Sequence, residues 1–152
     1  MIKKENKIKI QKMNYNLNRF LTAQAQDYSI ALREIQNGGK QSHWIWYIFP
    51  QIKGLGHSYQ SEYYGIASRQ EAEAYMAEPT LNARLREITI ALLAHKSKSA
   101  QQILGHTDAL KVKSSMTLFD AVSPNDIYAD VLNIFYNGQR CQKTIEYLTK
   151  QN

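Results

Sequence analysis

The segment from residue 42 to residue 58 carries the side chains with the clearest potential for binding or proton transfer. It begins with a run of six apolar residues, 44–49, which contains both tryptophans of the chain and ends at Pro50. A histidine precedes this run, and a loop with two glycines, a lysine and a second histidine follows it. The residues of interest are His43, Trp44, Trp46, Gln51, Lys53, Gly54, Gly56, His57 and Ser58.

The glycine-containing loop has the composition of an anion site. Gly54 and Gly56 let the backbone approach a ligand, and a helix that starts at Ser58 would add free amides. Lys53 would supply a positive charge, and His57 a hydrogen-bond donor or proton carrier. We therefore expect a phosphate or carboxylate here, although an ordinary turn between two helices also explains two glycines. The nucleotide-binding pattern G-x-x-x-x-G-K-[ST] is missing.

The aromatic run supports two interpretations. The indole faces of Trp44 and Trp46 could stack on a planar ligand, and His43 beside them could transfer a proton. The run could equally be hydrophobic core. Both a short helix and a strand fit six apolar residues, and the helical neighbours favour the helix. Because adjacent helical residues point in different directions, the run is either buried all round or lines a cavity with one face.

A second group of polar residues lies far along the chain, at Lys113, Ser114 and Ser115. Serines inside a helix compete with its backbone hydrogen bonds and weaken it. Such a local conflict is typical of a functional site, so we predict that these residues join the pocket of the aromatic run. The alternative is that small residues allow two helices to pack closely.

Helical periodicity surrounds these groups. Apolar stripes at intervals of three and four are Leu21, Ala25, Tyr28, Leu32 and Ile35, and later Leu81, Leu85, Ile88 and Leu92. Capping signals predict further helix starts at Ser42, Ser58, Ser68, Pro79, Ser99, Thr107 or Asp108, Ser123–Asp126 and Cys141. Strand-like alternation is nearly absent. We therefore expect an all-α fold, a single compact domain of about seven to eight mostly short helices.

Positive charge is concentrated at the start of the chain. Residues 1–12 contain five lysines and one acid, and they contribute +4 of the formal net charge of +6. We expect residues 1–13 to be a basic disordered leader, with Met13 as an alternative natural start, and residues 14–152 to form the helical domain. The remaining +2 argues against nucleic acid as a partner of the folded domain.

Composition and spacing disfavour several other classes of protein. No apolar run approaches the roughly 18 residues of a membrane span, and no secretory signal is recognisable, so we expect a cytoplasmic location without membrane contact. The single cysteine, Cys141, excludes an intramolecular disulfide. The four histidines lack metal-ligand spacing, and we predict neither a metal nor a cofactor. The sequence does not indicate an oligomeric state.

Two long motifs stand in order along the chain, S-H-W-x-W-x-I-F-P-Q from Ser42 and S-S-M-T-L-F from Ser114. With the sequence around them, from about Leu17 to Leu148, they resemble the bacterial family called domain of unknown function 1810. The resemblance implies a compact all-helical fold and no particular reaction. Members sometimes carry the protease-inhibitor label calpastatin, which nothing in these residues supports. The family pattern usually has aspartate where Cys141 stands, at the start of the last helix. Cysteine caps poorly there, at a cost on the order of 1 kcal/mol.

The motifs of the resemblance coincide with the residues chosen for their chemistry, so we expect them to meet around one pocket. The leading hypothesis is a pocket for a small anionic, partly planar ligand of the nucleotide-derivative type, with hydrolysis as an open possibility. His43 and His57 are the candidate proton-transfer groups. The stretch SEYYGIAS is also loosely similar to the Glu-x-Tyr-Tyr region of helical NADAR-type N-glycosidases, which act on nucleotide-like substrates, and this implies Glu62 as a candidate carboxylate. The alternative is a non-catalytic module that binds a protein or nucleic acid.

Overall fold

The computed structural model describes residues 15–151, and within this range the chain forms nine helices and no strand longer than an isolated bridge. The all-α fold expected from the sequence is confirmed. The proposed leader, residues 1–13, lies outside the described residues. The helices are α2 (Asn18–Gln36), α3 (Ile45–Ile48), α4 (Tyr59–Tyr63), α5 (Arg69–Ala77), α6 (Pro79–Leu93), α7 (Ala100–Leu104), α8 (His106–Val122), α9 (Ile127–Phe135) and α10 (Gln142–Lys150).

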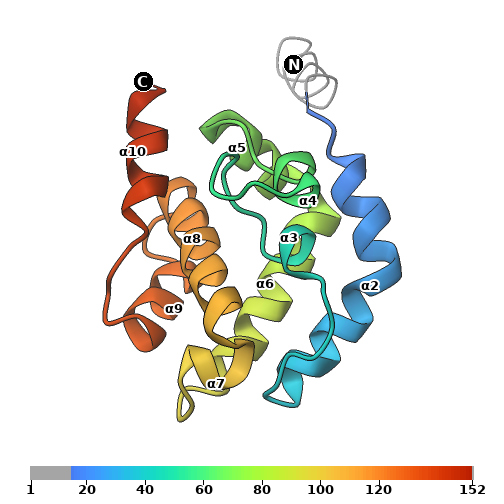
Figure 1. Ribbon diagram of the computed structural model, residues 1–152, viewed down its shortest axis with the longest axis vertical. Coiled ribbons are helices and arrows are strands. Elements are labelled where there is room, and N and C mark those ends of the chain that lie inside the picture. Colours follow the sequence, from blue (N-terminus) through green and yellow to red (C-terminus); the bar gives the residue numbers. More distant parts are fainter. Residues whose placement is uncertain (1–14, 152) are drawn as a thin grey trace.

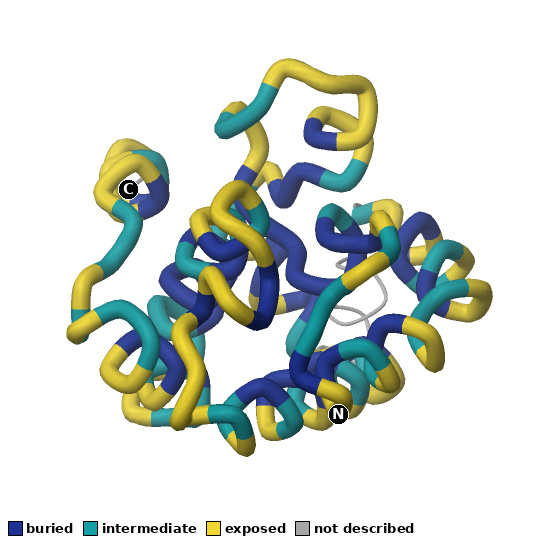
Figure 2. The backbone as a smooth tube through the Cα atoms, turned by 60° about the horizontal axis from the view of Figure 1, so that its bottom comes forward, coloured by how far each residue is buried: buried dark blue, intermediate teal, exposed yellow. Residues whose placement is uncertain are grey.

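The long helices form layers around a shared core. Helix α2 packs on α6, α6 also packs on α9, and α8 packs against α7, α9 and α10. Figure 1 shows α2 and α10 on opposite sides of the molecule, with α6 and α8 between them. Buried residues gather on the inner sides of the helices in Figure 2, where the outer sides are exposed. The short helices α3 and α4 belong to the connection between α2 and α5.

The predicted stripe of α6 is confirmed, because Leu81, Leu85, Ile88 and Leu92 are all at most 1% exposed. Several predicted caps are also present. Pro79 occupies the first turn of α6, where a missing N–H costs nothing. Ser99 and Gln102 form a complete capping box at α7. These local signals therefore place most of the helices correctly.

Two predicted helix starts are wrong. Ser42 does not cap the helix of the aromatic run, because α3 begins three residues later with Trp44 as its N-cap, and the Ser42 hydroxyl bonds elsewhere. Helix α8 begins at His106, directly after Gly105, rather than after Thr107 or Asp108. Neither α3 nor α8 has a side-chain capping hydrogen bond at its first turn.

The buried face of α2 differs from the predicted stripe. Of the five predicted residues only Ile35 is fully buried, and Ala25 is exposed. The face is rotated by about one residue, which is roughly 100° on a helix. The residues of α2 that are buried are Arg19, Phe20, Gln24, Ala31 and Ile35.

Gln24 shows why the true face was hidden from pattern analysis. Its Nε2 donates to the backbone oxygen of Tyr47 at 2.8 Å and to the hydroxyl of Tyr75 at 3.0 Å. A buried amide whose hydrogen bonds are satisfied costs little stability. A polar residue can therefore occupy the core side of α2, but its partners lie 23 and 51 positions away in sequence.

Within residues 15–151, none of the helices combines the length and apolar character needed to cross a bilayer. In the same part of the chain, no three His, Cys, Asp or Glu residues lie together as metal ligands would. The expected cytoplasmic location stays a prediction.

Candidate functional site

The aromatic run is buried on nearly every side. Trp44, Ile45, Tyr47, Ile48 and Phe49 are each at most 6% exposed, whereas Trp46 is only partly buried. The run therefore behaves mainly as core. The ring of Trp44 is 1% exposed, which leaves no open face on which a ligand could stack.

Glu34, near the end of α2, explains how the chain enters this run. Its Oε1 accepts hydrogen bonds from the backbone N–H groups of Gln41 and Ser42 at 2.8 and 2.9 Å and from the indole Nε1 of Trp44 at 2.9 Å. Its Oε2 accepts from the Ser42 hydroxyl. Burial alone would raise the pKa of Glu34, but these hydrogen bonds outweigh it and lower the pKa to about 2. One carboxylate thus fixes residues 41–44 against α2.

Lysines already cover the faces of both tryptophans. The Nζ of Lys40 lies 4.7 Å from the ring centroid of Trp44, and the Nζ of Lys111 lies 4.3 Å from that of Trp46. Asp108 pairs with both lysines, at 2.7 Å from Lys40 and 3.3 Å from Lys111. These cation–π contacts stabilise the run from the side of α8. Stacking of a ligand on Trp46 would have to displace Lys111.

The loop after the run is anchored at its start and exposed beyond it. A short parallel bridge joins Ile52 to Ile66, with hydrogen bonds of 2.8 Å from the Lys53 amide to Ile66 and from the Ile66 amide to Gln51. Gln51 is buried, and its Nε2 has no hydrogen-bond partner among the described residues. Gly54 has a φ of +93°, a conformation that favours glycine. The exposed side chains of the segment are those of His43, Lys53, His57 and Ser58.

Ser58 does cap a helix, as expected, and its hydroxyl accepts a hydrogen bond from the Ser61 amide at 3.1 Å. That helix, α4, has only five residues, so it adds little dipole to an anion site. Gly56 has a structural role here. A Cβ at this position would lie 3.0 Å from the side chain of Ser61 and 3.3 Å from the ring of Trp46. The loop geometry thus accounts for its glycines without a ligand.

The three residues of the second predicted group point in different directions from α8. Lys113 is roughly 200° around the helix from Lys111, and it lines a separate cavity of about 480 Å³ with Arg140 and residues near the start of α10. The hydroxyl of Ser114 lies 3.2 Å from that of Thr144, which brings α8 and α10 close together. Ser115 is fully buried, and its hydroxyl has no partner among the described residues. These contacts match close helix packing, the alternative interpretation of the two serines.

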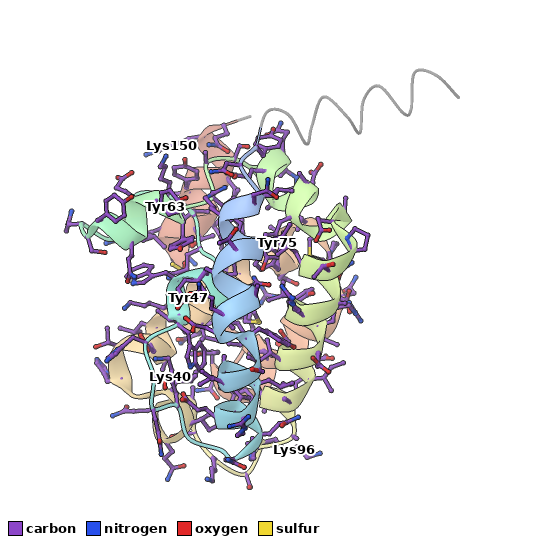
Figure 3. The ribbon with its side chains drawn as sticks, turned by 90° about the vertical axis from the view of Figure 1, so that its right-hand side faces the viewer. Lys40, Tyr47, Tyr63, Tyr75, Lys96 and Lys150 are labelled. Carbon is purple, nitrogen blue, oxygen red and sulfur yellow. The ribbon has the colours of Figure 1, made fainter. Side chains whose placement is uncertain are left out.

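A cavity that the sequence analysis did not predict lies between α2, α3 and α4. Its volume is about 390 Å³. Tyr47 and Tyr63, which both line it, lie on the same side of α2 in Figure 3. Most of the lining is polar: Asn16, Asn18, Arg19, Gln26, Asp27 and Gln60, together with the rings of Tyr47, Tyr63 and Tyr64.

An acid and a phenol meet inside this cavity. The hydroxyl of Tyr47 donates a hydrogen bond to Oδ2 of Asp27. Burial, together with the hydrogen bond and charge of Asp27, raises the pKa of Tyr47 above its usual value, so the phenol keeps its proton. Asp27 is only partly buried, and the cavity can therefore present its carboxylate to a ligand.

Arg19 supports one wall of the cavity. Its guanidinium donates to the backbone oxygens of Asn16, Tyr63 and Gly65 at 2.6, 2.8 and 3.1 Å. The same group pairs with the buried Glu71 at 2.9 Å. The other carboxylate oxygen of Glu71 accepts a hydrogen bond from the Ala67 amide at 2.8 Å. The charge of Arg19 is therefore compensated within the protein.

Sequence reasoning missed this cavity because its lining residues look like ordinary surface. Gln26 and Asp27 stand on what reads as the solvent face of α2, and Gln60 is an exposed glutamine on a short helix. The only available signal was the polar spacing of Arg19, Gln26 and Asp27 along one helix. The candidate carboxylate Glu62 is exposed and does not line the cavity.

Comparison with known proteins gives one family and one solved relative. Residues 14–148 match the family described as "Protein of unknown function (DUF1810)". The chain belongs to this family. Among solved structures, this DUF1810 chain is similar to the conserved hypothetical protein Rv1873 from Mycobacterium tuberculosis. The two are 37% identical with a TM-score of 0.87, over 90% of this chain and 98% of the other. No curated protein matches the chain.

Proposed function

We propose that this chain binds a small, polar and partly planar ligand of the nucleoside or nucleotide-derivative type in the cavity between α2, α3 and α4. The observation that carries the proposal is the Asp27–Tyr47 pair inside a cavity of about 390 Å³ that is walled by tyrosine rings and side-chain amides. Small-molecule sites typically have volumes of about 300–1,000 Å³ and a few convergent polar groups.

The charges of the lining favour a ligand with hydrogen-bond donors inside the cavity. Glu71 compensates Arg19, so Asp27 supplies the free negative charge. A carboxylate accepts hydrogen bonds only, which suits ribose hydroxyls or an exocyclic amine better than a phosphate. The tyrosine rings suit a planar group such as a base.

The expected anionic part of the ligand would then lie outside the cavity. Lys53 and His57 are exposed cation and donor candidates in the segment that leads into α4. Their role in holding a phosphate stays a proposal, and so does the placement of Trp46 and Lys113 in the same site. Asp27 is better placed than Glu62 to act on a ligand in the cavity, should the site also hydrolyse it.

Thermal unfolding in the presence of ligands tests the proposal. The panel comprises nucleosides, nucleotides, ADP-ribose-like compounds and sugar phosphates. A ligand at 100 times its dissociation constant adds about 2.7 kcal/mol to the unfolding free energy. For a chain of this length that is a rise in Tm of roughly 5–10 °C. Product analysis of the same samples distinguishes a binding module from a hydrolase.

Two exposed glutamines allow the site to be probed without damage to the fold. Gln26 and Gln60 line the cavity, and their side chains make no hydrogen bond within the described residues. The double substitution Gln26→Ala with Gln60→Ala should weaken binding about tenfold and leave the Tm of the free protein unchanged. Gln101→Ala, an exposed glutamine on α7 outside the cavity, is the matched control.

Lys53→Ala separates the phosphate from the rest of the ligand. This substitution should weaken the binding of phosphorylated compounds only, because a nucleoside carries no negative charge with which Lys53 could interact. A ligand-induced rise in Tm that is as large in the double glutamine variant as in wild type would place the ligand elsewhere and contradict the proposal.

A further inference from the structure

One wall of the cavity, the ring of Tyr63, is part of an exposed stack of two tyrosine rings on α4. Tyr63 lines the cavity, and the ring of Tyr59 lies against it with centroids 5.7 Å apart and an interplanar angle of 9°. On its inner side Tyr63 meets Tyr64 edge to face, at 4.9 Å. Tyr63 is 41% exposed and Tyr59 is 79% exposed. In Figure 3, Tyr63 stands on a helix that projects away from α2.

Local geometry explains why the two rings are aligned. Residues 59 and 63 are four apart, so their side chains lie on one face of α4. Although α4 is short, both of its ends are held. The Ser58 hydroxyl caps its start, and Arg19 bonds to the backbone oxygen of Tyr63 at its end. The tyrosine stack is therefore presented by a fixed backbone rather than by a loose loop.

We infer that the outer face of Tyr59 is a second stacking subsite, so that the ligand of the cavity has two planar rings joined by a flexible linker, as in a dinucleotide-type compound. This inference rests on the proposed function, because it assigns the first ring to the cavity. It goes further by naming a ligand of two rings. A face that is mostly exposed and parallel to its neighbour offers the contact area that a base or nicotinamide-like ring needs.

The spacing of the rings decides between a dinucleotide and a strand of nucleic acid. A ring on the outer face of Tyr59 lies one contact distance, about 3.5 Å, beyond that side chain. Because the parallel ring of Tyr59 stands between that site and Tyr63, a ring in the cavity and a ring on Tyr59 are separated by at least two contact distances, roughly 7 Å. Consecutive bases of a strand are about 3.4 Å apart, so they fit this spacing poorly. An extended linker such as a diphosphate spans it.

The charge of the surrounding segment fits the same ligand. From residue 53 to residue 64 there is one lysine, one acid and one histidine, which is too little positive charge for a polyanion. The negative charge of a linker with one or two phosphates can be compensated by solvent and by a single cation such as Lys53.

A pair of matched probes tests the inference, namely diadenosine diphosphate and adenosine monophosphate. Binding of each to the full chain is measured by calorimetric titration. We expect the two-ring probe to bind about tenfold more tightly than the one-ring probe. Tyr59→Ala should remove that advantage and leave the affinity for adenosine monophosphate unchanged. Tyr59→Phe, which retains the aromatic ring, should retain the tighter binding of the two-ring probe.

Controls separate loss of the subsite from damage to the fold. Leu110→Ala truncates another exposed apolar side chain, on α8, and should change neither affinity. The Tm of each free variant shows that it is folded. If both probes bind wild type equally, or if Tyr59→Ala weakens both to the same degree, the second subsite is refuted and the cavity proposal stands. If neither probe binds, the nucleotide class fails for both proposals. Tighter binding of a short oligodeoxyadenylate than of the two-ring probe would refute the small-ligand class.

Discussion

Replacement of Glu34 by glutamine tests the reasoning on which the description of the site depends. Glu34 accepts four hydrogen bonds, two from backbone amides and two from the side chains of Ser42 and Trp44. Glutamine has nearly the same shape but no charge, and only one of its two terminal atoms can accept. Glu34→Gln therefore removes the charge from these bonds and leaves the carbon skeleton in place.

The magnitude follows from the pKa of the carboxyl. A decrease from 4.5 to about 2 corresponds to about 3 kcal/mol of preference for the ionised form in the folded state. Because Glu34 is only partly buried, solvent screening reduces this figure, and we expect a loss of about 1–2 kcal/mol at neutral pH. Glu34→Ala should cost about 1–3 kcal/mol more, since it leaves the buried indole N–H of Trp44 without an acceptor.

The pH dependence has a definite sign. The folded-state pKa of Glu34 lies below its unfolded value, so its contribution is fully present above about pH 4.5 and is lost as the pH falls towards 2. The stability difference between wild type and Glu34→Gln should therefore be largest at pH 7 and less than half as large at pH 3. Urea unfolding followed by tryptophan fluorescence measures both values, because the two indoles are Trp44 and Trp46.

Glu73→Gln is the matched control. Glu73 is 48% exposed on its side chain and makes only an ion pair with Arg69, one helical turn away. Its substitution should change stability by less than about 0.5 kcal/mol at either pH. A loss from Glu34→Gln as small as that of the control, or a loss that is the same at pH 7 and pH 3, would refute the assignment of Glu34 as the anchor of residues 41–44.

Two further predictions concern single positions. Cys141 precedes α10 without a side-chain capping bond. Cys141→Asp should therefore stabilise the fold by about 1 kcal/mol in urea unfolding, whereas Cys141→Ala should not. Equal stability of the two variants would show that the first amides of α10 need no cap. Arg19→Met leaves Glu71 buried and uncompensated, so it should cost about 3–5 kcal/mol, whereas Arg33→Met at an exposed position of α2 should cost less than about 0.5 kcal/mol. The double substitution Arg19→Met with Glu71→Leu should recover much of the lost stability. If it recovers none, the broken ion pair is not the cause of the loss.

The helices that could be predicted from the sequence are those whose apolar pattern coincides with burial. Helix α6 is such a case, since all four residues of its stripe face the core. Helix α2 is not, because Arg19 and Gln24 are buried and polar. Their partners Glu71 and Tyr75 lie about 50 residues later. A periodicity of three and four reports only the residues of one helix, so it cannot show that a distant side chain satisfies a polar group in the core.

Sequence patterns are limited in the same way at the candidate site, where the surroundings of each side chain come from distant parts of the chain. The aromatic run stood out in the sequence, but the environment of its partly exposed Trp46 depends on Lys111 of α8, which covers that ring from a point 65 positions later in the chain. The residues of the cavity were overlooked because Gln26 and Gln60 are exposed polar side chains like many others. What makes them notable is the space between α2 and α4, and only tertiary structure creates that space.

Two polar anchors explain why this space persists. Glu34 ties residues 41–44 to the last turns of α2, and Arg19 ties residues 63–65 to its first turn. The segment that carries α3, the glycine loop and α4 runs between these points and is therefore fixed to α2 at both ends. Because the walls of the cavity are held in this way, binding of the proposed ligand would require little additional ordering of the backbone. The same anchoring lets five-residue α4, which would not be stable alone, present Tyr59 and Tyr63 in a defined orientation.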